Sequence, residues 1–281
     1  MATGCGDPTA TWTGPDGQVR VGRDGQVHDG REPHLGEAPR LLPVAPDGRV
    51  RPPRPVAPSV WALPDPVTGT HEDLIGFGAD LAPSTLVDAY RRGIFPWPHQ
   101  DTPLPWFSPD PRGVMTTSSL HLARSLRRTL RRCGWTTTVD ADFAGVVAGC
   151  AARGREGTWI TIEMARAYQR LNELGWAHSV EVWADRELVG GIYGVQVGAV
   201  FTGESMFHRR PDASKVALVD LLDRFTTAGG ALLDVQLLTP HLATLGAYEV
   251  PRSVFLADLR VLRERTVRML VARRSVTPLA A

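Results

Sequence analysis

The chain has 281 residues, of which 43% are hydrophobic and 22% are charged, proportions that are typical of a folded globular protein. Its formal net charge of +1 excludes a protein that binds nucleic acid through a global excess of basic residues, so any such contact must use a local patch. The three cysteines are too few and too far apart for a disulfide framework or a metal site, and no apolar run approaches the ~20 residues of a membrane span.

The first residues also lack the basic and apolar pattern of a secretion signal, so we expect a cytoplasmic protein. Residues 1–57 are dominated by Gly, Pro, Asp and Arg, with repeated turn triplets such as Pro15-Asp16-Gly17. This segment has too little apolar material to offset the entropy of ordering it. We therefore expect a disordered N-terminal extension.

Order is expected to begin near Trp61. The segment Leu81–Arg92 has helical spacing, with a proline near its start and Gly93 at its end. The following residues, Gly93–Pro111, are rich in Pro and Trp. Because proline removes a backbone donor and biases the residue before it, we expect no regular structure there. The aromatic side chains of this loop either pack as a plug or line a pocket.

A helix is predicted from about His121 to Cys133. Its leucines recur on one stripe, while most of its arginines fall on the opposite side. This arginine face consists of Arg124, Arg128, Arg131 and Arg132, with Arg127 at its edge. The helix has no acidic residue to relieve the repulsion, and the guanidinium group matches phosphate geometry. The residues alone leave a solvated face and a phosphate-binding face equally open.

From Trp159 onward, helical and strand-like segments alternate. Thr161 can cap a helix that runs to Leu174. The pattern then predicts three strands, at Ser179–Trp183, Glu187–Val195 and Val200–Met206, followed by a helix at Asp212–Thr227 and a strand at Ala231–Leu238. A short helix from Thr239 to Gly246 and a last helix from Ser253 to about Leu270 complete the chain. Three meandering strands followed by helix, strand and helix indicate an α+β fold of the acyltransferase kind.

The strand Ala231–Leu238 contains two polar residues, Asp234 and Gln236, in an otherwise apolar run. Side chains two residues apart on a strand point to the same face. A buried carboxylate and amide without partners would be costly, so this pair either performs chemistry or recognition, or forms a satisfied hydrogen-bonded pair. Neither His178 nor His241 has a Ser, Cys or acidic partner that is spaced for a catalytic triad. We interpret both histidines as structural.

Several strings resemble the leucyl/phenylalanyl-tRNA–protein transferase family. They are GIFPW, WFSPDPR, RSLRRTLRR, TWIT, LGWAHSVEVW, GESMF, PDASKVAL and LLDVQLLTPHLATLGA, in this order between about Trp61 and Leu259. The resemblance implies transfer of Leu or Phe, and Met less well, from aminoacyl-tRNA to the N-terminal α-amino group of proteins starting with Arg or Lys, which marks them for N-degron proteolysis. It implies no metal and no cofactor, and we expect a monomer.

The implied fold is a GNAT-like (N-acetyltransferase-type) sheet-and-helix domain with a smaller N-terminal α/β domain. The corresponding boundaries are 1–57 for the extension, 58–115 for the small domain, 116–271 for the acyltransferase-like domain with the arginine helix, and 272–281 for a tail. The extension has no counterpart that we expect in the family.

The resemblance also implies roles for particular residues. Asp234 and Gln236 are the expected catalytic pair, with Asp234 either orienting Gln236 or sharing the proton. The expected substrate-binding residues are Trp97 and Trp159 for the terminal adenosine and aminoacyl group, Tyr90 and Tyr168 for the same wall, Ile192, Phe201 and Ser205 for the apolar side chain, and Glu204, with Asp234, for the cationic acceptor. The helix with Arg124, Arg128, Arg131 and Arg132 is expected to contact tRNA phosphates.

Two other functions fit parts of the pattern. A coenzyme-A-dependent N-acetyltransferase should have a glycine-containing turn that holds a pyrophosphate, and Gly190, Gly191 and Gly194 lack that arrangement. A non-catalytic tRNA-binding protein would keep the arginine helix without needing Asp234 and Gln236. Ile192 stands where the family can have a longer methionine, so the preference among Leu, Phe and Met stays open.

Overall fold

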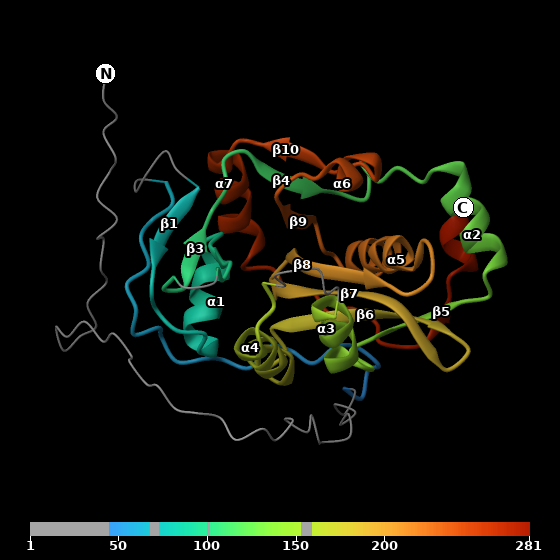
Figure 1. Ribbon diagram of the computed structural model, residues 1–281, viewed down its shortest axis with the longest axis horizontal. Helices are drawn as coiled ribbons and strands as arrows, with labels where there is room; N and C mark the ends of the chain where they lie inside the picture. Colours follow the sequence, from blue (N-terminus) through green and yellow to red (C-terminus); the bar gives the residue numbers. More distant parts are fainter. Residues whose placement is uncertain (1–44, 68–72, 100–101, 153–158) are drawn as a thin grey trace.

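The computed structural model describes residues 45–67, 73–99, 102–152 and 159–281. Most of the predicted N-terminal extension lies outside these ranges. The described chain is a mixed α+β protein with two sheets, as the sequence predicts (Figure 1). A small sheet has the order β1-β3-β2, and an eight-stranded sheet has the order β10-β4-β9-β8-β7-β6-β5-β11.

The large sheet is built around an antiparallel meander of β6, β7 and β8. Its strands are β4 (Arg112–Met115), β5 (Thr136–Val139), β6 (Ala177–Ala184), β7 (Glu187–Val197), β8 (Val200–His208), β9 (Leu232–Gln236), β10 (Tyr248–Val250) and β11 (Arg274–Ser275). Strand β9 runs parallel to β8, but the two pair only from Val200–Leu232 to Thr202–Asp234. Strand β8 continues to His208 without β9 beside it, and this divergence opens the sheet at the end of β9.

Helices cover both faces of the meander. They are α1 (Pro83–Arg91), α2 (Arg124–Arg132), α3 (Phe143–Ala151), α4 (Ile162–Glu173), α5 (Ala213–Thr227), α6 (Pro240–Thr244) and α7 (Arg252–Leu262), followed by the 3₁₀ helix η1 (Thr277–Ala280). One core cluster joins α5 and α2 to one face, and a second joins α1, α3 and α4 to the other. Figure 1 shows α5 and the pair α3 and α4 on opposite sides of β6–β8.

The predicted helix starts are confirmed where a cap or proline marked them. The hydroxyl of Thr161 accepts from the Met164 amide at 3.1 Å, and Thr239 caps α6 in the same way. The prediction for the last helix is wrong at its end: α7 ends at Leu262 and not near Leu270. The carbonyl of Leu262 instead accepts from the Ala199 amide at 3.0 Å, so the helix end is tied to the β7–β8 turn.

The Pro- and Trp-rich loop contains regular structure, contrary to the prediction. Strand β2 (Phe95–Pro96) pairs with β3 (Pro105–Phe107), and β1 (Leu74–Phe77) pairs with the other edge of β3. The Trp97 amide donates to the Pro105 carbonyl at 3.1 Å. The ladder uses proline carbonyls and the amides of other residues, so the missing proline donors do not interrupt it.

Both ends of the described chain are held by pairing: the N-terminal end forms an isolated bridge between Arg49 and Leu270, and the C-terminal end joins the large sheet. The Val50 amide donates to the Met269 carbonyl at 2.8 Å, and the Val50 side chain is buried, although composition groups it with the extension. The segment 272–281, expected to be a tail, contributes β11, which pairs with β5, and η1, which packs on α2. Strand β4, at the end of the small-domain range, belongs to the large sheet. None of the described helices has the length and apolar character to cross a membrane.

Candidate active site

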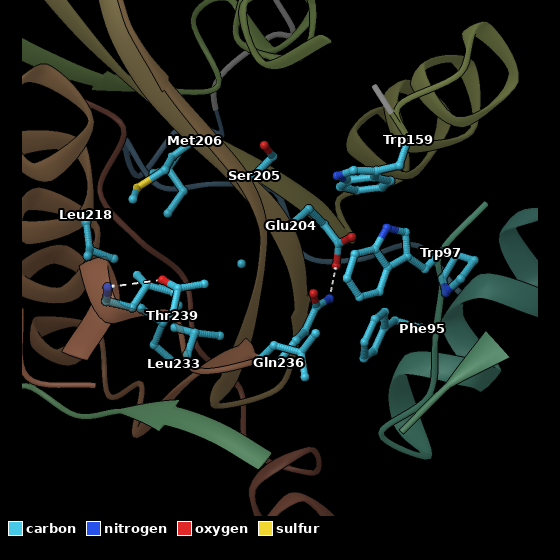
Figure 2. A pocket seen from close by; sticks show the side chains of 16 residues that line it. Phe95, Trp97, Trp159, Glu204, Ser205, Met206, Leu218, Leu233, Gln236 and Thr239 are labelled. Carbon is cyan, nitrogen blue, oxygen red and sulfur yellow. Dashed lines mark hydrogen bonds between the residues drawn. The ribbon is translucent and has the colours of Figure 1, made fainter. Parts of the chain in front are cut away.

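A cavity of about 250 Å³ lies where β8 and β9 diverge (Figure 2). Its apolar part is lined by Ile192, Met206, Leu218, Leu233, Val235, Leu237 and Leu242, and the rest of its lining comprises Phe95, Pro96, Trp97, Trp159, Gly203, Glu204, Ser205, Gln236 and Thr239. The cavity is therefore an apolar space with a few polar groups and two tryptophans, the composition of a small-molecule or side-chain pocket.

The tryptophans come from two separate segments. Trp97 directly follows β2, and its ring stacks on His99 with centroids 5.9 Å apart and meets Phe107 edge-on at 5.9 Å. Trp159 lies shortly before the Thr161 cap of α4. Figure 2 shows both indole rings beside Glu204, at the side of the cavity away from Met206 and Leu218. Flat, partly exposed indoles in this position can stack on a nucleobase.

Glu204 is buried at the centre of a hydrogen-bonded network. Its Oε1 accepts from Tyr90 at 2.8 Å and from the Gln236 side-chain amide at 3.0 Å, and its Oε2 accepts from Tyr168 at 2.8 Å. Glu204 itself is the extra residue of an irregularity in the β7–β8 ladder, where Tyr193 pairs with Ser205 and Gly194 with Gly203. Such a bulge redirects a side chain, and here the carboxyl is directed toward the two tyrosines and Gln236.

The protonation of Glu204 follows from the same contacts. Burial raises the pKa of Glu204 to about 7, although the bonds from Tyr168 and Tyr90 oppose the rise. The two phenol oxygens also lie 2.6 Å from each other. Three short contacts among three hydroxyl-bearing groups need three protons, and the phenols supply only two. When the carboxyl is protonated it supplies the third by donating to one phenol, which reverses the direction of that one bond, so the geometry agrees with a group that titrates near neutral pH.

Asp234 does not line the cavity and is completely buried. Its Oδ1 accepts from Arg112 Nε at 2.7 Å and from the Gln236 backbone amide at 2.9 Å. Its Oδ2 accepts from Arg112 Nη2 at 2.7 Å and from the Thr202 hydroxyl at 3.0 Å. Gln236 has a left-handed backbone with φ of 64°, which this amide bond supports. The two residues are thus joined, but only Gln236 lines the cavity.

The other expected substrate-binding residues separate into two groups. Ile192 and Ser205 line the cavity, whereas Tyr90 and Tyr168 lie behind Glu204. Phe201 does not line the cavity: it is buried in the core, with its ring centroid 5.9 Å from that of Phe225. Sequence reasoning did not single out Arg112 or the apolar wall residues Leu218 and Leu242. A buried carboxylate requires a partner, and this was the available signal for Arg112.

Helix α2 has the amphipathic arrangement that the sequence predicts. Leu126 and Leu130 are buried, and Arg124, Arg128, Arg131 and Arg132 are exposed. Arg127 is half-buried and donates to the carbonyls of Ala280 and Ala281, at 3.1 and 2.8 Å. Figure 1 shows α2 at the end of the molecule opposite to β1 and α1. An exposed arginine face at this end is available for a polyanion.

His178 is a buried structural residue, as interpreted from the sequence. Its Nδ1 lies 2.7 Å from Asp140 Oδ2, and the same aspartate accepts from Asn172 and the Ser179 amide. Within the described ranges, no group of three or more His, Cys, Asp or Glu residues is arranged to hold a metal ion. The polar side chains that line the cavity are those of Glu204, Ser205, Gln236 and Thr239, beside the two indole rings.

Two family models match this chain, one over residues 79–110 and one over residues 114–260. The family model of the leucyl/phenylalanyl-tRNA protein transferase matches residues 114–260, and the model of the N-terminal domain of that transferase matches residues 79–110. Similar proteins named leucyl/phenylalanyl-tRNA–protein transferase include those of Idiomarina loihiensis, 45% identical over 212 residues (74% of this chain and 90% of the relative), and Anaeromyxobacter dehalogenans strain 2CP-C, 49% identical over 211 residues (74% and 91%).

A third relative, with the same name and from Escherichia coli O81, is 48% identical over 204 residues, which cover 72% of this chain and 87% of the relative. Among solved structures, one described as the structure of L-PGS from Bacillus licheniformis aligns with a TM-score of 0.33 and 12% identity, over 61% of this chain and 67% of that chain. This score is too low to define a shared fold.

Proposed function

This chain belongs to the leucyl/phenylalanyl-tRNA–protein transferase family and is an aminoacyltransferase, and from that premise we propose its substrates and mechanism. It transfers Leu or Phe, and Met less well, from aminoacyl-tRNA to the N-terminal α-amino group of a protein that begins with Arg or Lys. The transferred residue marks the protein for N-degron proteolysis in the cytoplasm. The observation that carries this proposal is an apolar cavity with two tryptophans and the Glu204–Gln236 pair beside it.

The cavity supports a division of the aminoacyl-adenosine between two subsites. The apolar part, with Ile192 and Ser205 in its lining, receives the Leu or Phe side chain. Trp97 and Trp159 hold the terminal adenosine and the aminoacyl group by stacking, and Tyr90 and Tyr168 support the Glu204 side of this wall. The exposed arginines of α2, Arg124, Arg128, Arg131 and Arg132, bind phosphates of the tRNA stem and so contribute affinity without reading sequence.

The chemical step needs little more than positioning. An aminoacyl ester is already activated, and an α-amine with a reference pKa of ~7.7–8.0 is partly neutral at cytoplasmic pH. The amine nitrogen attacks the ester carbonyl carbon, the bond from that carbon to the ribose oxygen breaks, and the proton from nitrogen ends on the released ribose oxygen. Good orientation of two bound substrates gives effective molarities of ~10⁵ M or more, so it supplies much of the rate.

Gln236 and Asp234 provide this orientation. The side-chain nitrogen of Gln236 donates to Glu204, which leaves the amide oxygen to accept a hydrogen bond from the attacking amine. Asp234 acts through Gln236, whose backbone amide it holds. Of the two acidic groups, Glu204 attracts the cationic acceptor in its ionised form, because its pKa is about 7 and the charge of Asp234 is compensated by Arg112 at 2.7 Å.

We also infer that residues 116–271, together with β4 and β11 of the same sheet, form a domain of the N-acetyltransferase type. What supports this is the meander β6–β8 followed by α5 and by a parallel strand β9, together with the divergence of β8 and β9 at the cavity. In a coenzyme-A enzyme this opening would receive a thioester. The tryptophans and the exposed arginine helix favour the 3′ end of an aminoacyl-tRNA instead.

The test is transfer of label. Purified protein is incubated with tRNA charged with radiolabelled Leu or Phe and with a protein beginning with Arg, and separately with the same protein beginning with Ser. We expect label in the Arg protein only, and none from labelled acetyl-coenzyme A. Absence of transfer from both charged tRNAs, in a preparation that binds tRNA, would overturn the proposed activity.

A further inference from the structure

Arg112 is the buried cation of the active-site region. It begins β4, and its guanidinium carbon lies 5.0 Å from the centroid of the Phe95 ring and 4.5 Å from that of Phe255. A guanidinium between two aromatic faces has little freedom to move, and the contacts add cation–π attraction. The position of Arg112 is therefore fixed by packing before its hydrogen bonds are considered.

The hydrogen bonds of Arg112 reach both sides of the cavity. Nε and Nη2 bind the two oxygens of Asp234, which holds the Gln236 amide, and Nη1 donates to the Gly93 carbonyl at 3.1 Å. Gly93 begins the segment that carries Phe95 and Trp97. The forked guanidinium group of Arg112 thus connects the segment that bears Trp97 with the end of β9, which bears Gln236.

The acceptor positions of the Asp234 carboxylate are all used by hydrogen bonds. Each of its oxygens accepts two hydrogen bonds: Oδ1 from Arg112 and Gln236, and Oδ2 from Arg112 and Thr202. An ionised carboxylate offers about four lone-pair positions. Asp234 therefore serves as a template that fixes its donors.

We propose that Arg112 is a positioning residue of the transfer reaction, which sets Gln236 relative to the Trp97 wall through Asp234 and Gly93. This inference rests on the proposed function, because it concerns the rate of that transfer. Removing the fork displaces the Gln236 amide relative to the bound ester, and a displacement of about 1 Å lowers a rate by up to about 10²-fold. Lysine cannot replace the fork, because it is a point charge without the bidentate geometry.

The ion pair also has an electrostatic consequence for Glu204. Glu204 is hydrogen-bonded by Tyr90 from α1, Tyr168 from α4 and Gln236 from β9, and it interacts electrostatically with Tyr193 from β7, Asp234 from β9 and Arg112 from β4. The charge of Asp234 raises the pKa of Glu204, and the charge of Arg112 lowers it. While both charges are present, their effects on the pKa of Glu204 oppose each other. Removal of one charge leaves the effect of the other unopposed.

The experiment compares Arg112→Lys, Arg112→Met, Asp234→Asn and the double variant Arg112→Met/Asp234→Asn with the wild type. The control is Arg224→Lys, because Arg224 forms a similar buried pair with Asp220 at 2.7 Å away from the cavity. Three quantities are measured for each folded protein: kcat, the KM for the acceptor protein, and the pH profile. The value of kcat is expressed per molecule that can bind charged tRNA.

We expect Arg112→Lys to lower kcat by about 10- to 100-fold with little change in KM or tRNA affinity. Arg224→Lys should lower the thermal unfolding midpoint but leave kcat unchanged. The acidic limb of the pH profile should move to higher pH in Arg112→Met and to lower pH in Asp234→Asn, and it should return toward the wild type in the double variant.

Equal kcat values for Arg112→Lys and Arg224→Lys, with a transferring wild type, would overturn the inference about Arg112 alone. A wild type that transfers neither amino acid would overturn the proposed function. If Arg112→Met does not fold, Arg112→Lys and the double variant, which leaves no unpaired buried charge, still decide the question.

Discussion

The side-chain amide of Gln236 donates to Oε1 of Glu204 at 3.0 Å, and this bond crosses the place where β8 and β9 stop pairing. Each partner has an unusual backbone: Glu204 is the extra residue of a bulge, and Gln236 has a positive φ. The register Thr202–Asp234, continued by two residues, would place Glu204 opposite Gln236, so the two side chains stay neighbours although the strands no longer pair. The end of the ladder therefore holds a titratable carboxyl and a neutral amide together beside an apolar cavity.

Gln236→Asn tests the role of the amide with the least disturbance of the backbone. Asparagine tolerates the left-handed conformation that Gln236 adopts, but its amide is one methylene shorter and cannot keep both the Glu204 bond and the contact with the amine. We expect the transfer rate to fall by roughly 10²-fold, the size of effect that follows from misplacing a bound reactant by about 1 Å. The measurement is single-turnover transfer from charged tRNA.

The affinity for charged tRNA serves as the control for Gln236→Asn, and we expect it to stay unchanged. A parallel loss of affinity and rate would show that Gln236 contributes to binding and not to the chemical step.

The stability of the protein should decrease as the pH rises from about 4.5 to 8. Burial raises the pKa of Glu204 to about 7 and that of Glu181 to about 8, while a carboxyl group of the unfolded chain titrates near ~4.3. The folded state therefore binds more protons than the unfolded state in this window. Stability from these groups is fully present below their unfolded pKa and is lost as the pH rises through the folded pKa, with a total on the order of a few kcal/mol.

Denaturant unfolding at pH 5, 6, 7 and 8 measures this dependence. Glu181→Gln should flatten the curve up to pH 8, and Glu204→Gln should flatten it only up to pH 7. Glu163→Gln, at an exposed position of α4, is the matched control. A stability that is constant over this range in the wild type would contradict the raised pKa values.

How much the sequence predicted depended on whether the signal was local. The Thr161 and Thr239 caps and the leucine stripe of α2 were visible because each is set by neighbours along the chain. The strand pattern placed the Asp234 and Gln236 side chains on one face, whereas Asp234 binds the Gln236 backbone amide and only Gln236 lines the cavity. Short strands such as β2 were missed because their ladder partners decide them. Phe201 was assigned to the cavity by resemblance, but packing places it against Phe225.

Arg112 was missed for a similar reason, since its partner Asp234 is 122 residues away along the chain. The end of α7 at Leu262 was also set by a distant contact, the bond from the Ala199 amide. Both features depend on backbone and side-chain contacts that form only in the folded sheet.

Charge reversal on α2 tests its contact with tRNA. The double change Arg128→Glu and Arg132→Glu replaces two exposed cations with anions. We expect weaker tRNA binding and a salt dependence whose slope falls by about one for each phosphate contact that is lost. The measurement is the dissociation constant of charged tRNA over a series of salt concentrations.

The control has the same change in net charge elsewhere on the surface. Arg260→Glu with Arg265→Glu alters two exposed arginines at and after α7, and it should leave the slope closer to that of the wild type. If both double variants weaken binding equally, the effect is one of overall charge, and α2 has no special part in the contact.

Gly203→Ala is expected to change the choice between Leu and Phe. A methyl group at Gly203 would meet its nearest atoms at 3.8 to 3.9 Å, namely the Asp234 carbonyl, Leu233 and Ile192, so it fits without strain. Leu233, Ile192 and Gly203 all line the cavity, and the methyl group therefore takes space from the transferred side chain. One methylene in an apolar pocket is worth about 1–3 kcal/mol, and the larger Phe should lose more than Leu. Competition between the two charged tRNAs in one reaction should then show a Leu-to-Phe ratio raised about tenfold or more, whereas an equal decrease for both amino acids would place the side chain elsewhere.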